Sequence, residues 1–114
     1  EIEALAPIDI LRRAGVEVTV AGLKDMVVKS ARGVAVTADK ELDQVSGEFD
    51  ALLLPGGGGG AKNLGASEKV KSLILEMNKK GKWIAAICAA PALVLAPTGI
   101  LHGRSATCYT DMES

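Results

Sequence analysis

The sequence of 114 residues has few aromatic residues and few cysteines. Phe, Trp and Tyr together make up 3% of it, which leaves no platform on which nucleic-acid bases could stack. Two cysteines, Cys88 and Cys108, are too few for a disulfide framework and favour a reducing compartment. No apolar run reaches the roughly 18 residues of a membrane-spanning helix, so no membrane partner is expected.

An excess of charge of one sign is also missing. The 13 basic and 14 acidic side chains give a net charge of -1, and no block of like charge stands out. Nucleic acid is therefore not expected as a partner, because phosphate binding needs a concentrated basic face. What is present is a globular composition, 48% hydrophobic and 24% charged, of a length that predicts one domain over residues 1–114. The absence of a signal peptide and of an initiating methionine suggests a trimmed start.

Helical and strand-like patterns alternate along the chain. Residues 67–81 give the clearest helix, with Ser67 as its N-cap, and residues 49–57 give a continuous apolar strand that ends at a Pro-Gly break. Such an apolar run is typical of a strand buried on both faces. The alternation predicts an α/β fold with a mainly parallel sheet and helices on its faces. The remaining expected elements are a helix over 3–14 that starts near Pro7, strands over 16–22, 82–87 and 103–110, two β segments within 26–39 that bend at Arg32-Gly33, and a helix from residue 90.

Two notable features directly follow predicted strands, namely a run of five glycines and Cys88. Ligands of open α/β sheets bind at the carboxyl ends of the strands, so both features are expected at one edge. The glycine run resembles a P-loop, but Ala61 replaces the last glycine and Asn63 replaces the Ser or Thr that binds magnesium. The run is then either a flexible loop or a source of backbone N–H donors, at Gly56 and Gly57, for an anion or an oxyanion.

Cys88 lies within "WIAAICAAPALVLA", where an apolar strand meets an apolar helix. One interpretation is a small buried hydrophobic residue, which is a common role of free cysteine. The other is a nucleophile on a sharp turn that the small neighbours Ala89 and Ala90 permit, with the helix dipole favouring the thiolate. The spacing leaves both open, and the G-x-S-x-G pattern of the hydrolase elbow is absent.

A family resemblance favours the nucleophile. The segments "AAICAAPALVLA", "LLLPGGGGGAKNL", "IEALAPIDILRRAGVEVTVAG" and "ARGVAV" resemble the ThiJ/PfpI superfamily, in the branch of Parkinson disease protein seven and its deglycase or glyoxalase-III-like relatives. The resemblance spans nearly the whole chain, with the motifs in the family's order. It implies a flavodoxin-like three-layer sandwich, related to the class I glutamine amidotransferases, that forms homodimers.

The resemblance also assigns roles to individual residues. Cys88 corresponds to the family's reactive cysteine, and Glu3 corresponds to the glutamate that hydrogen-bonds its sulfur. Gly56, Gly57 and Ala89 correspond to the positions whose backbone amides line an anion pocket. No metal is expected.

The implied activity is a cofactor-independent one. A glyoxalase III or protein deglycase converts methylglyoxal or glyoxal to the hydroxy acid, or removes early glycation adducts, and so protects against glycation and oxidative stress. The alternative is a redox sensor or chaperone without catalysis that acts through oxidation of Cys88. The expected partners are small reactive aldehydes or glycated groups and a second copy of the chain, in the cytoplasm or in a nuclear or organellar pool.

The sequence departs from the family pattern in two respects. Cys108 occupies a place where the family often has a histidine, and it is a pocket wall, plain packing or a resolving thiol. The sole histidine, His102, is expected in a surface turn next to Gly103. Arg13 and Arg32 are expected either on a solvated surface or near the pocket and the dimer interface. The family's first strand and C-terminal part have no counterpart here, which predicts an incomplete domain.

Overall fold

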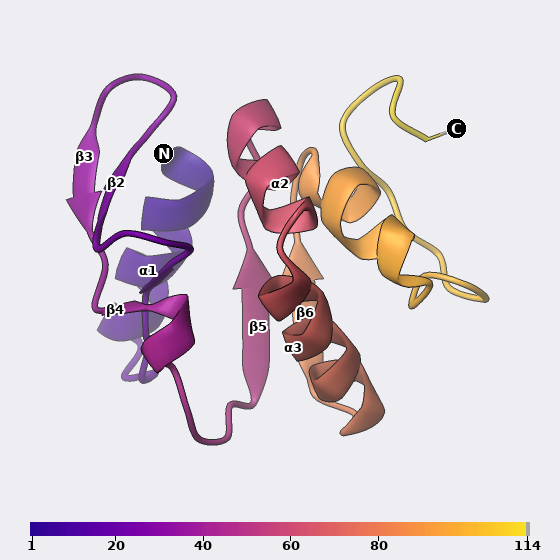
Figure 1. Cartoon of the computed structure of the whole chain (residues 1–114), viewed down its shortest axis with the longest axis horizontal. Helices are drawn as coiled ribbons and strands as arrows, with labels where there is room; N and C mark the ends of the chain where they lie inside the picture. The colour runs from indigo at the N-terminus through magenta and orange to yellow at the C-terminus, as the bar shows by residue number, and fades with distance from the viewer. Residues whose placement is uncertain (114) are drawn as a thin grey trace. The chain divides into compact units, whose positions relative to one another are not determined.

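The computed structural model describes residues 1–113, and the chain divides into two compact units, Glu1–Gly47 and Glu48–Ser114. The predicted alternation of helices and strands is confirmed within them (Figure 1). Among the described residues the strands form three two-stranded sheets, two of them parallel and one antiparallel. No helix in this part of the chain is long and apolar enough to cross a bilayer.

The first unit opens with α1, Ile2–Arg13. The helix predicted over 3–14 is confirmed to within one residue at each end, but Pro7 lies inside the helix rather than in its first turn. A proline inside a helix removes one backbone bond, and α1 continues past it for two turns. The helix ends as predicted just before Gly15, whose φ of 83° leaves the helical region.

The strand predicted over 16–22 is reduced to β1, Ala21–Gly22, which pairs in parallel with β4, Lys40–Glu41. Next to β1, a side chain makes a bond that a neighbouring strand would otherwise make. The carboxylate of Asp39 accepts a hydrogen bond from the Val20 amide at 2.7 Å, and the Val20 carbonyl accepts from the Asp39 amide at 2.8 Å. Residues 16–20 belong to no strand pair of the described sheets.

The two β segments predicted around Arg32-Gly33 are confirmed as a hairpin of β2, Val27–Lys29, and β3, Ala35–Thr37. Gly33 supplies the positive φ of 84° that the loop requires. The Ser30 amide donates to the Val34 carbonyl at 2.8 Å, and the Ser30 hydroxyl accepts from the Val34 amide at 3.0 Å. After β4, the 3-10 helix η1, Leu42–Gln44, completes the unit.

The second unit is built on a parallel pair of strands, β5, Ala51–Leu54, and β6, Trp83–Ala86. In register, Ala51 lies opposite Trp83 and Leu54 opposite Ala86. Two helices connect the strands, as a parallel pair requires. They are α2, Gly58–Gly65, and α3, Glu68–Lys79, and the strands are followed by the π-helix η2, Pro91–Leu95, and the 3-10 helix η3, Ala96–Thr98.

The predicted N-cap of α3 is confirmed, since the Ser67 hydroxyl accepts from the Val70 amide at 3.3 Å. The apolar side of α3 enters the core of the unit, where Ile74 is fully buried. Gly65 allows close packing of α2 on η2, because a Cβ there would lie 2.3 Å from the Leu93 carbonyl oxygen. The other buried residues of this core are Leu54, Ala61, Val70, Met77, Ala89, Ala90, Pro91, Val94 and Leu95.

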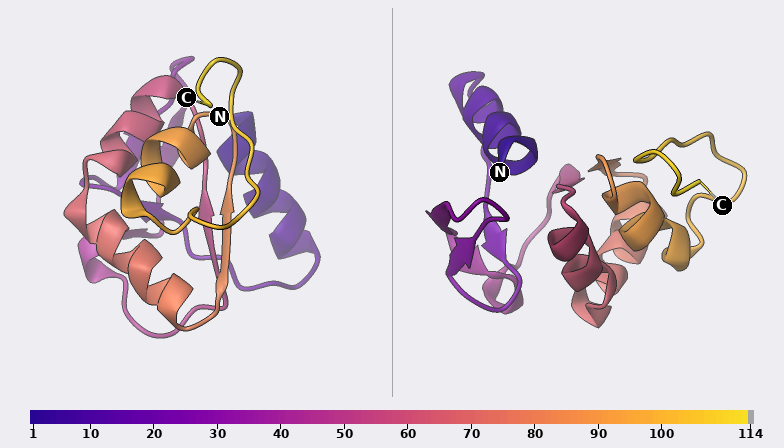
Figure 2. Two further views of the ribbon diagram at one scale, coloured as in Figure 1. Left: turned by 90° about the vertical axis from the view of Figure 1, so that its right-hand side faces the viewer. Right: turned by 90° about the horizontal axis from the view of Figure 1, so that it is seen from above.

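The prediction that the strand over 49–57 is buried on both faces is wrong for the second unit taken by itself. Its helices all lie on one side of the β5–β6 pair, as the view from above shows (Figure 2, right). Side chains on the other side are open to solvent, with exposed fractions of 43% for Leu53, 80% for Trp83 and 52% for Ile87.

One of the two alternatives for the glycine run, and one further prediction in this unit, are wrong. Gly58–Gly60 form the first turn of α2 rather than a flexible loop, because the Gly57 carbonyl accepts from the amide of buried Ala61 at 2.8 Å. Residues 103–110 form turns and irregular backbone instead of a strand. A single backbone bond, from the Tyr109 amide to the Cys88 carbonyl at 2.8 Å, ties this segment to the end of β6.

Candidate active site

Cys88 lies at the second position of a tight turn that begins where β6 ends. The Ala90 amide donates to the Ile87 carbonyl at 3.1 Å and closes the turn. Cys88 has a φ of 61°, in the left-handed region that residues other than glycine seldom adopt. Strain of this kind persists only where the surrounding structure imposes it, and it concentrates at functional sites.

The residues around the turn impose that conformation. Before it, the Ile87 amide donates to the Leu54 carbonyl at 3.3 Å and extends the β5–β6 ladder by one bond. After it, Ala89 and Ala90 are buried, and the Ala89 carbonyl accepts from the Leu93 amide at 2.9 Å. The backbone is thus fixed on both sides of Cys88, while the residue itself is only half-buried.

The helix after the turn differs from the expected one. Instead of a regular α-helix, the chain forms the five-residue π-helix η2 and then the short η3. Pro91 at the first position of η2 has no amide to donate, which suits a helix start. π-Helical turns occur often at functional sites, but a helix this short gives little support to the predicted dipole effect on Cys88.

The glycine run and Cys88 meet at one edge, as the strand pattern predicts. Because Leu54 lies opposite Ala86 in a parallel pair, Gly56 and Gly57 leave β5 at the same end at which Cys88 and Ala89 leave β6. Gly57 has a φ of 81°, which only glycine adopts without strain.

Some backbone N–H groups at this edge have no acceptor among the described residues. Within residues 1–113, the amides of Gly57, Cys88 and Ala89 donate no hydrogen bond. Nearly all buried amides in proteins have a partner, and Ala89 is a buried residue. Unpaired N–H groups beside a thiol suit an anion or a developing oxyanion.

The other predicted site residues belong to the first unit. Glu3 lies in the first turn of α1 and is half-buried. The guanidinium of Arg13 pairs with Asp9 at 2.9 Å on the same helix. Exposed Arg32 lies in the hairpin loop, where its amide donates to the Glu1 carboxylate at 3.0 Å. The roles of all three remain predictions.

Cys108 and His102 lie in the segment after η3. Cys108 is half-buried and reduced, and burial together with the Glu113 carboxylate raises the pKa of its thiol. His102 is exposed in a turn, as predicted. The residue that the sequence did not single out is Tyr109, whose amide holds the Cys88 carbonyl. No sequence signal indicated it, because the bond comes from the backbone.

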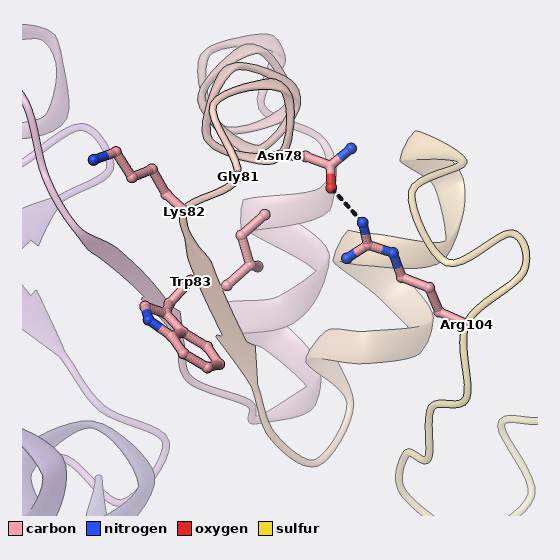
Figure 3. A pocket seen from close by; sticks show the side chains of 6 residues that line it. Asn78, Gly81, Lys82, Trp83 and Arg104 are labelled. Atoms are coloured by element: carbon pink, nitrogen blue, oxygen red, sulfur yellow. Dashed lines mark hydrogen bonds between the residues drawn. The ribbon is translucent and has the colours of Figure 1, made fainter.

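An open pocket of about 390 Å³ lies at the opposite end of β6 (Figure 3). The guanidinium of Arg104 donates to the Asn78 side-chain oxygen at 3.0 Å there. The pocket also includes Gly81, Lys82, Trp83 and Ile84. It is separate from the turn at Cys88. No cluster of three or more metal-ligating side chains occurs among the described residues.

The fold and the turn define a class, namely α/β proteins that present a cysteine on a strained turn at the carboxyl end of a parallel strand. The chain matches the profile of the DJ-1/PfpI family over residues 1–114 and belongs to that family. The resemblance inferred from the motifs is confirmed.

Individual relatives support the assignment. Protein dj-1beta of Drosophila melanogaster is 46% identical over 115 residues, which cover 99% of this chain and 61% of the fly protein. A deglycase of Pyrococcus abyssi is 34% identical over 114 residues, covering 99% of this chain and 68% of the relative.

A solved structure confirms the predicted flavodoxin-like fold class. Toxoplasma gondii DJ-1 in an oxidized form superposes with a TM-score of 0.92 at 44% identity, over 95% of this chain and 60% of that chain. The chain thus spans about three fifths of the length of the fly and Toxoplasma proteins.

Proposed function

We propose that this chain carries the nucleophile of a cofactor-independent cysteine enzyme of the glyoxalase III or deglycase type. Its substrates are small α-oxoaldehydes such as methylglyoxal and glyoxal, and the product is the hydroxy acid. The observation that carries the proposal is the turn at Cys88, where a half-buried thiol is held at a φ of 61° beside unpaired backbone amides. Nothing in the packing of a core cysteine requires such strain.

The first step uses the thiol and the amides. The Cys88 thiolate attacks the aldehyde carbon of methylglyoxal, and the carbonyl π electrons move onto oxygen. The amides of Gly57 and Ala89 donate to the oxyanion that forms, and Gly56 lies at the same end of β5. Protonation of this oxygen gives a hemithioacetal.

The second step moves a proton between adjacent carbons. We assign Glu3 as the acid and base, because the family resemblance places it at the sulfur. Its carboxylate removes the proton from the former aldehyde carbon to give an enediol, in which the proton of the former aldehyde hydroxyl passes to the neighbouring oxygen, and Glu3 then returns its proton to the neighbouring carbon. A hydroxyacyl thioester of Cys88 results, and water hydrolyses it to the hydroxy acid and the free thiol.

The names of two relatives support two versions of this function. The Pyrococcus abyssi relative is called a deglycase, which fits attack of a thiol on aldehydes or on early glycation adducts. The Toxoplasma gondii structure is described as oxidized, which favours the second candidate, a redox sensor or chaperone that works through oxidation of Cys88. Both candidates need the same reactive thiol.

Turnover of methylglyoxal separates the two candidates. Product formation should fall by at least about three orders of magnitude in Cys88→Ser and about a hundredfold in Glu3→Gln. Glu17→Gln, which replaces an exposed carboxylate of the same unit, is the control and should keep its activity. A wild-type protein that is alkylated at Cys88 but forms no hydroxy acid would leave only the sensor. A Cys88 that resists alkylation until the protein unfolds would exclude both candidates.

Two properties implied by the family complete the proposal. We expect a homodimer, to be measured by light scattering, in which Arg13 and Arg32 lie near the pocket or the interface. We also expect a cytoplasmic protein, which fractionation would test.

A further inference from the structure

A single hydrogen bond brings the two cysteines of the chain together. The Tyr109 amide donates to the Cys88 carbonyl at 2.8 Å, and the segment that carries Cys108 runs in the same direction as β6 (Figure 1). In a parallel pairing, the residue before the donor lies opposite the acceptor. Cys108 is therefore the neighbour of Cys88 across the two segments.

The spacing of this pairing suits a disulfide. A backbone hydrogen bond between two segments holds them about 5 Å apart, and disulfides form between Cα atoms about 4.4–6.8 Å apart. Both thiols are reduced and half-buried. Exposed Ser105, Ala106 and Thr107 lie outside helices and strands, so the segment can adjust locally to the geometry of the bond.

We propose that Cys108 is the resolving thiol of Cys88, so that a hydroperoxide converts the pair to an intramolecular disulfide. This inference deepens the proposed function, because it rests on the same reactive Cys88. The disulfide would switch off the nucleophile reversibly and keep it from irreversible oxidation.

The chemistry takes two balanced steps. In the first, the Cys88 sulfur attacks one peroxide oxygen and the O–O bond breaks, so that hydrogen peroxide gives Cys88 sulfenic acid and one water. In the second, the Cys108 sulfur attacks the Cys88 sulfur, the S–O bond breaks, and the hydroxyl leaves as water with the Cys108 proton. Two electrons pass from the thiols to the peroxide.

The surroundings of Cys108 fit the second role rather than the first. Burial and the Glu113 carboxylate raise the pKa of its thiol, so it stays protonated near neutral pH. A protonated thiol reacts slowly with peroxide. Its attack on a sulfenic acid held across from it is intramolecular, which compensates for the small thiolate fraction.

The test treats the purified, reduced protein with one equivalent of hydrogen peroxide, blocks the remaining thiols and measures the mass without reductant. We expect a loss of two hydrogens in the monomer and a tryptic product that joins residues 83–104 to 105–114. Dithiothreitol should restore both thiols. In Cys108→Ser, the fraction of Cys88 sulfinic acid should rise by at least about fivefold.

A matched variant, Thr107→Cys with Cys108→Ser, moves the thiol by one residue, so it no longer lies opposite Cys88. It should form little of the intramolecular disulfide. Three outcomes would overturn the proposal. The first is equal cross-linking in this variant, and the second is sulfinic acid on Cys88 of the wild type while Cys108 stays free. The third is disulfides that form only between molecules.

Methylglyoxal turnover of the reduced wild-type protein is scored separately. A disulfide without turnover would leave this inference standing and remove the catalytic proposal. Turnover without a disulfide would do the reverse.

Discussion

The two ends of the β5–β6 pair differ in how their polar groups are paired. At the amino end, the Trp83 amide donates to the Asp50 carbonyl at 3.0 Å, and the Lys82 ammonium lies 3.6 Å from the Asp50 carboxylate. At the carboxyl end, the amides of Gly57 and Ala89 find no partner within residues 1–113. The comparison teaches that an unmade backbone bond points to a site where the residue is buried, as Ala89 is.

Both ends also contain a residue with positive φ, but of different kinds. At the amino end it is Gly81, with a φ of 69°, a conformation that glycine adopts without strain. At the carboxyl end, Gly57 is joined by Cys88, a residue with a side chain. Strain is therefore confined to the end that carries the thiol.

The largest effect should come from replacing one glycine at each end. Gly57→Ala and Gly81→Ala both force a Cβ into the left-handed region, and no other atom lies within 4 Å of either Cβ. Each should lower the free energy of unfolding by about 1 kcal/mol in urea titrations. Only Gly57→Ala should also lower kcat/KM for methylglyoxal, by at least about tenfold, because it redirects an oxyanion donor.

Equal turnover in these two variants would contradict the role of the carboxyl end. Gly58→Ala provides the control, because Gly58 is helical with open space around its Cβ. It should be neutral or stabilising by about 0.5 kcal/mol, with unchanged turnover.

A smaller effect should reveal the strain at Cys88 itself. Cys88→Gly and Cys88→Ala both remove the thiol, but only the glycine relieves the φ of 61°. Cys88→Gly should therefore be more stable than Cys88→Ala by about 1 kcal/mol in urea titrations. Ala86→Gly in β6, where the backbone is an ordinary strand, should instead lose about 0.5–1 kcal/mol. A Cys88→Gly less stable than Cys88→Ala would show that the turn is not strained.

The sequence indicated the parts of the site that depend on local pattern. Apolar runs located β5 and β6, and the rule that ligands bind at carboxyl ends located Cys88 and Gly57 at one edge. It also identified Ser67 as the cap of α3, because a hydroxyl before a periodic apolar segment has few other roles.

Contacts between distant residues could not be predicted in this way. Residues 16–20 alternate between apolar and polar side chains like a strand. The Val20 amide, however, donates to the Asp39 carboxylate instead of to a neighbouring strand. Gly58–Gly60 have poor helix propensity, but burial of Ala61 makes them helical. The φ of Cys88 depends on a turn whose two sides are fixed by β5 and by η2, which no single segment encodes.

The smallest effect concerns the amino end, where the Lys80 ammonium lies 2.9 Å from the Glu76 carboxylate and 3.5 Å from that of Glu48. The hydrogen bond and charge of Lys80 lower the pKa of Glu76, and Glu76 in turn raises the pKa of Lys80. A lowered carboxyl pKa stabilises the fold above the unfolded value of 4.5 and loses this effect as the pH falls through the folded value.

A raised lysine pKa stabilises the fold below 10.5 and loses this effect as the pH rises through the folded value. The thermal midpoint of Glu76→Gln should thus lie slightly below that of the wild type at neutral pH and approach it as the pH falls through the folded pKa of Glu76. The difference should shrink in 1 M salt, because both groups are exposed and salt screens them. Comparison with Lys80→Gln and with the double variant isolates the contribution of the Glu76–Lys80 pair to the thermal midpoint. A difference in thermal midpoint that persists at acid pH would mean that Glu76 stabilises the fold through packing. The ion pair with Lys80 would then not explain the stability of the amino end.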